Sequence, residues 1–579
     1  MTTADDLLAD LDEDQRVAAR TLIGPVCLLA GAGTGKTRAI THRIAYGVAT
    51  GVYPPGRVMA LTFTARSAGE LRGRLRRLGA SGVAARTFHA SALSQLSFFW
   101  PQVIGGSMPR ILESKGRMIA HAAERLSIKL DTAALRDLAS EIEWRKVSRL
   151  TLDGYAERAA SRTLPAGLSV GRMIDLHRAY EAVKDDRRQI DFEDVLLAAA
   201  GMLETQPWVA QQVREQYRFF TVDEYQDVSP LQQHLLDLWL GERRDVCVVG
   251  DASQTIYSFA GASPEALLGF PSRFREATVV RLQRNYRSTS SIVDTANRLM
   301  RDRPGALLLT TASGRADAGQ GSQKDPETRV SVYRDDRAEA RAVAGEIADA
   351  LADGTAAADV AVLYRVGVQG ALLETALSDA GVPFQIRGGT RFFALPEVKQ
   401  ALMMVRGASV AKTVEPLFKT VSDVLRSLGW TQDPPEARGA VRDRWESLNA
   451  IMGMAEEAPV GTTLRQFSDE LDERAAGQHE PVLAAVTLAT LHSAKGLEWE
   501  SVYIVGVSEG LVPISYARTP EAVDEERRLL YVGITRARRR LRLSWASAQP
   551  QRSAQRAQSR FLEELSIRSP DAASARVPS

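Results

Sequence analysis

One segment near the start of the chain constrains its fold more than any other. An apolar run, VCLLA (26–30), leads into GAGTGKT (31–37), and a helical pattern, RAITHRIAYGV (38–48), follows. Glycines at this spacing let backbone N–H groups wrap around phosphates where a helix begins. Ala30 stands where the strict pattern has glycine, an exchange that several families accept. The segment predicts a strand, a phosphate-binding loop and a helix; a glycine-rich turn without a ligand is the alternative.

Further apolar runs rich in β-branched residues repeat this pattern along the chain. With residues 26–30 they form the set 58–63, 219–222, 246–249, 360–363 and 502–507. Helical patterns follow these runs, and strands that alternate with amphipathic helices predict parallel sheets covered on both faces. A chain of 579 residues exceeds what one hydrophobic core serves. The early and late runs therefore predict two α/β units.

The composition restricts the partners and the compartment. Lysine and arginine number 73 against 71 acidic residues, so a site for a polyanion requires local clustering. Cys27 and Cys247 lie in apolar runs, which favours buried thiols in a reducing compartment over a disulfide framework. The acidic amino terminus lacks a signal-peptide pattern, and no apolar stretch is long enough to span a bilayer. These features predict a cytoplasmic protein without a membrane partner.

A pair of carboxylates gives a second chemical signal. Asp223 and Glu224 directly follow the apolar run at 219–222. In nucleotide hydrolases an aspartate at such a position holds Mg²⁺ and a neighbouring group activates water. Taken alone, such a pair is more often a solvated charge at the start of a helix. Combined with the phosphate-binding loop, the pair predicts a Mg²⁺ ligand and a general base.

Ten segments form an ordered set that covers most of the chain. They are LDEDQR (11–16), AGAGTGKT (30–37), ALTFTARSAGELRGRL (60–75), TFHA (87–90), DFEDVL (191–196), TVDEYQD (221–227), VVGDASQTIYSFAGA (248–262), LQRNYRS (282–288), TLHSAKGLEWESVYIVG (490–506) and EERRLLYVGITRA (525–537). In this order they resemble the UvrD/PcrA/Rep group of superfamily 1 helicases, a stronger signal than any single pattern. The resemblance implies an α/β fold with two RecA-like P-loop NTPase domains and helical insertions. It also implies ATP-dependent 3′-to-5′ translocation on single-stranded DNA and DNA unwinding, in repair or replication.

The resemblance assigns a site for ATP and Mg²⁺ by position. Residues expected to bind ATP are Gln15, Ala32, Gly33, Thr34, Gly35, Lys36, Thr37, Arg38, Tyr286 and Glu498. Gln15 would read the adenine edge and Tyr286 would stack on its face. Thr37 and Asp223 would ligate Mg²⁺, and Lys36 would reach the β- and γ-phosphate oxygens.

Catalytic roles follow from the same resemblance. Glu224 would act as the catalytic base, and Gln254 would sense the γ-phosphate. Arg287 and Arg536 resemble arginine fingers from the second domain, because a planar guanidinium stabilises charge on a transferring phosphoryl group. Without the resemblance, both arginines would be interpreted as surface residues and Tyr286 as half-buried core.

A track for single-stranded DNA needs aromatic faces for bases and donors for the backbone. The family's positions for this track hold Phe63, Thr64, His89, Tyr257, Phe259 and His492. Many relatives have tryptophan where Phe259 stands, and phenylalanine offers less stacking area. Core packing is the alternative for Phe63 and Phe259. In the basic segment from Arg66 to Arg86, Arg72 and Arg76 would share one helical face that could rest on a phosphate backbone, although a solvated basic face is equally compatible with the pattern.

The expected domains follow the family's order. They are the first RecA-like domain (1–90 and 191–280), a helical insertion (91–190), the second RecA-like domain (281–400 and 486–546), a reduced helical insertion (401–485) and a disordered tail (547–579). The stretch 314–326 is expected to be a loop or disordered. The insertion is shorter than the 2B region of full-length relatives, which puts strong unwinding by this chain alone in doubt. The Ala/Arg-rich composition also suits an actinobacterial branch whose full-length form carries an HRDC-type module.

Two hypotheses from different classes follow. The first is an ATP-driven translocase and helicase whose partners are single-stranded DNA, 3′-tailed duplex DNA and DNA-repair proteins. The second is a DNA-dependent ATPase that remodels protein–DNA complexes or scaffolds repair partners with little unwinding, which the short insertion favours. A P-loop kinase or GTPase would need an acceptor site or a base-specific NKxD-type signal, and neither occurs in the sequence. The expected state is a monomer or weak oligomer in the cytoplasm, associated with the nucleoid.

Overall fold

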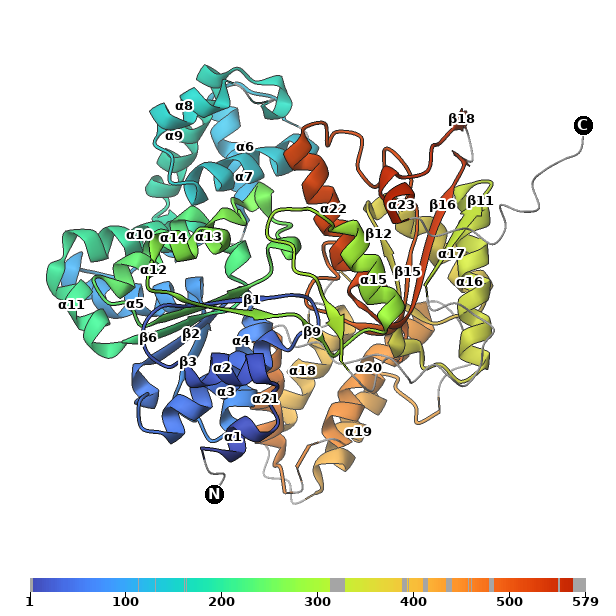
Figure 1. Cartoon of the computed structure of the whole chain (residues 1–579), viewed down its shortest axis with the longest axis horizontal. Helices are drawn as coiled ribbons and strands as arrows, with labels where there is room; N and C mark the ends of the chain where they lie inside the picture. Colours follow the sequence, from blue (N-terminus) through green and yellow to red (C-terminus); the bar gives the residue numbers. More distant parts are fainter. Residues whose placement is uncertain are drawn as a thin grey trace, which may run out of the picture. The chain divides into compact units, whose positions relative to one another are not determined.

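A computed structural model describes residues 4–565 except 113, 131, 161, 163, 313–327, 388–392, 394, 410–414, 434–439, 457, 460, 478–483 and 550–551. The chain forms two compact units, Met1–Gln283 and Arg284–Ser579 (Figure 1). The division follows strand β8 (Thr278–Leu282), close to the expected boundary at 280/281. The stretch 314–326, expected to be a loop or disordered, lies outside the described residues. Among the described helices, none has the length and hydropathy that crossing a bilayer requires.

The first unit is built on a six-stranded parallel sheet in the order β3-β2-β6-β7-β1-β8. Its other strands are β1 (Val26–Ala30), β2 (Val58–Thr62), β3 (Ala84–Thr87), β6 (Phe219–Val222) and β7 (Val246–Gly250). Alternate residues of β1 belong to two different hydrophobic clusters. Cys27 belongs to one cluster with Met59 and Phe220, whereas Val26 and Leu28 belong to the other. Both faces of the sheet are therefore covered, which confirms the predicted α/β class.

Helices of the first unit connect these strands and form an insertion. They are α1 (Asp6–Ala9), α2 (Glu13–Arg20), α3 (Lys36–Ala49), α4 (Ala65–Arg77), α5 (Phe88–Val103), α6 (Lys115–Arg125), α7 (Thr132–Val147), α8 (Leu152–Ala159), α9 (Val170–Asp186), α10 (Phe192–Thr205), α11 (Pro207–Gln216), α12 (Pro230–Leu240), α13 (Glu265–Leu268) and α14 (Phe270–Arg273). Helices α6 to α9 have a core of their own, which includes Ile142, Tyr155 and Leu176. The short strands β4 (Arg110–Ile111) and β5 (Gln189–Ile190) pair in parallel where this insertion begins and ends.

A buried ionic cluster joins this insertion to α10. The Lys146 Nζ atom lies 2.6 Å from Asp191 Oδ2 and 2.7 Å from Asp194 Oδ1, and Lys184 pairs with the same two carboxylates. Although burial opposes its charge, Lys146 and Lys184 hold the pKa of Asp191 below its ordinary value. Glu181, Asp191 and Asp194 are close enough to share a metal ion, but the two ammonium groups already pair with them. The cluster therefore fixes the start of α10 by charge pairing.

Replacing Lys146 with methionine is expected to lower the free energy of unfolding by about 3–5 kcal/mol, because buried carboxylates lose a cationic partner. Urea denaturation followed by circular dichroism measures this change. Arg125→Met is the matched control, since the Arg125–Asp186 pair on the same insertion is exposed and should contribute less than about 1 kcal/mol. Equal, small losses for both variants would contradict a stabilising role for the buried cluster.

The second unit contains another six-stranded parallel sheet, in the order β11-β16-β15-β12-β14-β13. Its strands are β11 (Thr328–Tyr333), β12 (Val360–Tyr364), β13 (Phe384–Arg387), β14 (Val486–Thr490), β15 (Trp499–Ile504) and β16 (Ala537–Ala546). The accompanying helices are α15 (Ser290–Leu299), α16 (Asp336–Ala352), α17 (Gly370–Asp379) and α22 (Pro520–Ile534). The small strands β9 (Arg284–Asn285) and β10 (Thr310–Thr311) pair beside α15.

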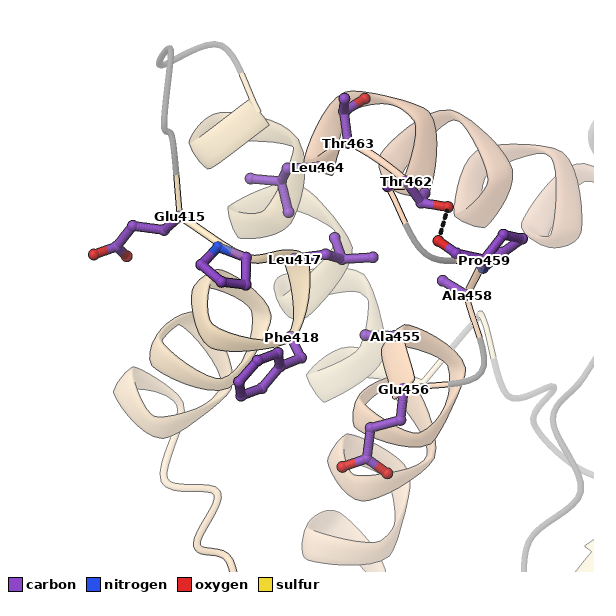
Figure 2. A pocket seen from close by; sticks show the side chains of 12 residues that line it. Glu415, Leu417, Phe418, Ala455, Glu456, Ala458, Pro459, Thr462, Thr463 and Leu464 are labelled. Carbon is purple, nitrogen blue, oxygen red and sulfur yellow. Dashed lines mark hydrogen bonds between the residues drawn. The ribbon is translucent and has the colours of Figure 1, made fainter.

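Four helices of the second unit pack around a separate core. They are α18 (Pro396–Ser409), α19 (Leu417–Ser427), α20 (Ala440–Glu456) and α21 (Leu464–Gly477). Val398, Val421 and Phe467 belong to this core. The bundle falls where the reduced helical insertion is expected. A pocket of about 610 Å³ lies at this bundle. Figure 2 shows its lining residues, among them Phe418, and none of them is assigned to nucleotide or DNA.

The tail expected from residue 547 is not disordered in its described part, so that expectation is wrong there. Strands β17 (Ala548–Gln549) and β18 (Arg552–Gln555) pair antiparallel, and helix α23 (Arg560–Leu565) follows. Phe561, Leu562 and Leu565 are buried, and α23 packs on α15. The polar composition is misleading because three apolar side chains on one face suffice to dock a short helix. Residues 566–579 of the expected tail lie outside the described residues.

Candidate functional site

The glycine-rich segment forms the loop between β1 and α3 in the first unit. Gly33 and Gly35 have φ angles of +70° and +80°, in the left-handed region that favours glycine. A Cβ atom on Gly35 would lie 2.7 Å from Gln15 Nε2, so a side chain at this position would displace the Gln15 amide. Helix α3 begins at Lys36, and the first turn of a helix presents free backbone N–H groups. The loop therefore fits a phosphate group.

The other residues expected around this loop are placed on it or beside it. Ala32 and Thr34 are buried, and the Thr34 hydroxyl donates to Gly31 O at 2.8 Å. Thr37 lies half-buried in the first turn of α3. Arg38 is exposed and donates to Asp10 O at 2.9 Å. The loop is thus ordered by its own contacts, and Thr37 follows it directly.

Gln15 is held against the loop from α2. Its backbone and side chain form a capping box with Asp12 at the start of that helix. The Gln15 Nε2 atom donates to Thr34 O at 2.9 Å, and the side chain is buried. An amide fixed beside the phosphate-binding loop offers both a donor and an acceptor to the edge of a base.

Lys36 is surrounded by carboxylates. Its Nζ atom lies 3.1 Å from Glu224 Oε1. Burial opposes the charge of Lys36, yet Glu224, Asp251 and Asp223 together raise its pKa above the ordinary value. The Lys36 ammonium group therefore stays charged and lies against the carboxylate of Glu224.

Asp223 provides the candidate metal ligand. It follows β6, where its backbone N–H donates to Leu61 O at 2.8 Å. Burial, and then repulsion from Glu224, raise the pKa of Asp223 to about 7. A divalent cation would relieve this repulsion, and hard oxygen donors such as a carboxylate and the Thr37 hydroxyl are those that Mg²⁺ prefers. The donor set therefore fits Mg²⁺.

Two residues that the sequence analysis did not assign complete this side of the site. Gln226 donates through Nε2 to Glu224 Oε2 and accepts from the Asp251 backbone N–H at 3.0 Å. Asp251 in turn accepts from Gln254 Nε2 at 2.8 Å. A continuous hydrogen-bonded chain thus joins Glu224 to Gln254. Both new residues lie inside the quoted segments TVDEYQD and VVGDASQTIYSFAGA, so their position in those segments was the available signal.

The second unit brings Arg287 and Glu498 together. The Arg287 Nε atom lies 2.5 Å from Glu498 Oε2, and Arg287 Nη1 donates to Thr535 O at 3.1 Å. Arg538 pairs with the other oxygen of Glu498. Although burial opposes the charge of Glu498, these arginines hold its pKa below the ordinary value. Glu498 is therefore an ionised anchor for Arg287. Tyr286, the preceding residue, leaves 39% of its surface exposed.

Arg536 lies differently from Arg287. It is buried, and its guanidinium donates to Val532 O at 2.9 Å and to Leu497 O at 3.2 Å. A guanidinium that bonds to backbone carbonyls within its own unit must exchange those bonds before it can reach a phosphate. Arg287 is likewise bonded within its own unit, to Glu498 and Thr535 O, but 21% of its side chain is exposed, whereas Arg536 is buried.

Three aromatic side chains expected on the DNA track take part in two stacked pairs in the first unit, and Phe192 is the fourth ring. The rings of Phe63 and Tyr257 lie 5.4 Å apart at 11°, and 40% of Phe63 is exposed. The ring of His89 stacks on Phe192 at 3.9 Å and 15°. Phe192 is 53% exposed and was not assigned from the sequence. Its position within DFEDVL was the only signal, because the contact with His89 is tertiary.

The remaining track residues are placed in three ways. Thr64 caps α4, where its hydroxyl accepts from the Ser67 N–H at 3.1 Å. His492 follows β14 in the second unit, half-buried. The side chain of Phe259 lies outside the described residues. On the basic helix α4, Arg72 donates to Ala85 O at 2.7 Å, so part of this face is used internally.

Comparison with known proteins gives the family. A model described as the UvrD/REP helicase N-terminal domain matches residues 11–275, and one described as the UvrD-like helicase C-terminal domain matches residues 280–432 and 442–548. The chain is 45% identical to ATP-dependent DNA helicase UvrD2 of Mycobacterium tuberculosis, over 96% of this chain and 82% of that protein. It is 30% identical to DNA helicase II of Escherichia coli (93% and 85% covered) and 27% identical to ATP-dependent DNA helicase PcrA of Bacillus subtilis (96% and 86% covered). The chain therefore belongs to the UvrD/Rep helicase family, which confirms the resemblance inferred from its ordered segments.

Proposed function

We propose that this chain is an ATP-driven DNA helicase that moves 3′-to-5′ along single-stranded DNA during DNA repair or replication. The observation that carries the proposal is the cluster around Lys36: a phosphate-binding loop, two carboxylates at Asp223 and Glu224, and a hydrogen-bonded chain from Glu224 to Gln254. Such a loop, carboxylate pair and hydrogen-bonded chain are the groups that a nucleotide hydrolase requires. The relatives of this chain are named DNA helicases. We propose that it acts on DNA of the nucleoid, in the cytoplasm.

Each site residue of the first unit would have a separate role in ATP hydrolysis. The loop N–H groups and Lys36 would hold the phosphates, while Thr37 and Asp223 would hold Mg²⁺, which neutralises charge on the transferring group when bound. Glu224 would orient and deprotonate the attacking water. Because Gln226 and Asp251 tie Glu224 to Gln254, the base and the proposed γ-phosphate sensor would move together.

The second unit would supply Tyr286 for the adenine face and Arg287 for the developing charge. Arg536 would follow after it releases its internal carbonyl partners. Hydrolysis that depends on arginines from another domain occurs only when the domains close. Cycles of closure and opening would advance the strand past the aromatic pairs Phe63–Tyr257 and His89–Phe192.

Steady-state ATP hydrolysis with and without oligothymidine tests the proposal. Stimulation by the oligonucleotide is expected, and Lys36→Ala should remove hydrolysis while single-strand binding persists. Hydrolysis that ignores single-stranded DNA, or survives in the lysine variant, would contradict the proposed site.

Phe192→Ala is expected to weaken single-strand affinity by about 1–3 kcal/mol, because its exposed ring extends the His89 face on which a base can stack. Fluorescence anisotropy with a labelled oligothymidine measures the affinity. Phe98→Ala is the matched control, since Phe98 is 60% exposed in the same unit, similar to Phe192 at 53%, but lies outside the proposed track. Unchanged affinity for the Phe192 variant would remove it from the track.

A second candidate is a DNA-dependent ATPase that remodels protein–DNA complexes or scaffolds repair partners. The small size of the bundle α18–α21 favours it, because the resemblance implies a larger insertion at this point of the chain in full-length relatives. Stimulated hydrolysis without strand displacement would select this candidate over the first.

A further inference from the structure

Arg538 is an arginine of the second unit to which neither the motifs nor the proposed hydrolysis assigns a role. It lies one residue beyond the quoted segment EERRLLYVGITRA (525–537). Its guanidinium pairs with two carboxylates, through Nη2 with Glu498 Oε1 and through Nη1 with Glu500 Oε1 at 3.3 Å. Because Glu498 also holds Arg287, Arg538 shares a carboxylate with the proposed finger.

The register of the sheet brings Arg538 and both carboxylates together. Trp499 of β15 pairs with Ala537 of β16, and both residues are buried. Successive side chains of a strand point to opposite faces, so the flanking residues Glu498, Glu500 and Arg538 project to the other face. The three charges therefore meet because β15 and β16 are parallel neighbours.

The segment that carries Arg287 is hydrogen-bonded to the segment that carries Arg538. The Ser288 hydroxyl donates to Ala537 O at 2.6 Å, and the Thr289 N–H donates to Arg538 O at 3.1 Å. The main chain therefore holds the two arginines on neighbouring segments, where one carboxylate can bind both.

Glu498 is bound at each of its oxygens. Arg287 Nε lies 2.5 Å from Oε2, and Arg538 pairs with Oε1. The last torsion of a glutamate side chain has a broad energy minimum, so a single partner leaves the carboxylate free to turn. A second guanidinium on the other oxygen fixes its plane. The side chains of Glu498 and Arg538 are each 35% exposed, so this pair contributes more to orientation than to stability.

We propose that Arg538 is a positioning residue for ATP hydrolysis, an inference that rests on the proposed function. Arg538 fixes the plane of the Glu498 carboxylate, and the carboxylate fixes the direction of the Arg287 guanidinium. A charge that is already oriented needs no reorganisation when negative charge develops on the transferring phosphoryl group. Arg538 therefore raises kcat and leaves the affinity for ATP nearly unchanged.

Steady-state ATP hydrolysis at saturating oligothymidine tests this role. Arg538→Met keeps the apolar stem without the guanidinium and should lower kcat roughly 10- to 100-fold, the effect of a slightly misplaced catalytic group, with little change in KM for ATP. Arg538→Lys should recover part of the rate, because an ammonium group still pairs with Glu498. Arg539→Met is the matched control, since Arg539 pairs with Glu500 and should keep the wild-type rate.

A double-mutant cycle under single-turnover conditions separates positioning from a structural role. In protein that already carries Arg287→Ala, Arg538→Met should slow hydrolysis no further, because no finger is left to position. A wild-type rate in Arg538→Met, or an equal loss with and without Arg287, would overturn the positioning role and leave Arg287 as the finger. An unchanged rate in Arg287→Ala alone would instead overturn the finger assignment of the proposed function, and this inference with it.

Discussion

Replacing Arg287 with alanine is expected to lower the kcat of ATP hydrolysis by roughly 10³- to 10⁵-fold, with a much smaller change in KM for ATP. The guanidinium is held in place by Glu498 at 2.5 Å and by Thr535 O at 3.1 Å, so it is pre-positioned at little entropic cost. An interaction made only in the transition state lowers kcat rather than substrate affinity.

Steady-state kinetics at saturating oligothymidine measure this effect. Arg287→Lys should recover only a small part of the lost rate, because a point charge lacks the planar fork of arginine. Arg539→Ala is the matched control; Arg539 is an exposed arginine of the same unit that pairs with Glu500, and its loss should leave hydrolysis unchanged. A kcat within a few-fold of wild type for Arg287→Ala would remove this residue as a finger.

Replacing Glu224 with glutamine is expected to lower kcat by roughly 10²- to 10⁴-fold, the usual contribution of a general base. Glutamine keeps the shape of the side chain and an oxygen that can accept from Lys36, so nucleotide binding should persist. The variant should therefore bind ATP without turning it over.

Single-turnover hydrolysis and equilibrium binding of a fluorescent ATP analogue separate these two effects. Glu215→Gln, an exposed carboxylate on α11, serves as the matched control and should hydrolyse ATP at the normal rate. Loss of nucleotide binding together with turnover in Glu224→Gln would indicate that the carboxylate holds the site together and would contradict its assignment as base.

Six of the twelve strands in the two large sheets were predicted from local apolar runs, although the run at 502–507 is offset from β15 (Trp499–Ile504). The apolar runs at 26–30 and 219–222 became β1 and β6 with identical bounds, since alternate residues enter cores on opposite faces. The loop residues around Lys36 could also be assigned to phosphate binding from the sequence, because a phosphate-binding loop requires glycines and a lysine at fixed spacing.

Other features depend on tertiary contacts that spacing does not encode. Phe192 joins the proposed track only because it meets His89, about a hundred positions earlier in the chain. The inward bonds of Arg536 depend on the carbonyls of Leu497 and Val532, which a motif cannot reveal. Helix α23 was missed because three buried side chains outweigh a polar composition.

The size of the bundle α18–α21 makes unwinding the property most in need of a direct test. The proposed translocation residues lie on or beside the two sheets, whereas the resemblance links engagement of a duplex to the insertion that we propose this bundle represents. If the proposed hydrolytic site and the small bundle are both as assigned, ATP hydrolysis on a single strand and poor separation of duplexes are compatible outcomes.

Strand displacement from a 3′-tailed duplex, in parallel with 5′-tailed and blunt duplexes, tests the central claim most directly. We expect ATP-dependent displacement of the 3′-tailed substrate alone, and none with Lys36→Ala. Displacement that prefers the 5′-tailed duplex, or DNA-stimulated hydrolysis that releases no strand from any substrate, would contradict a self-sufficient 3′-to-5′ helicase.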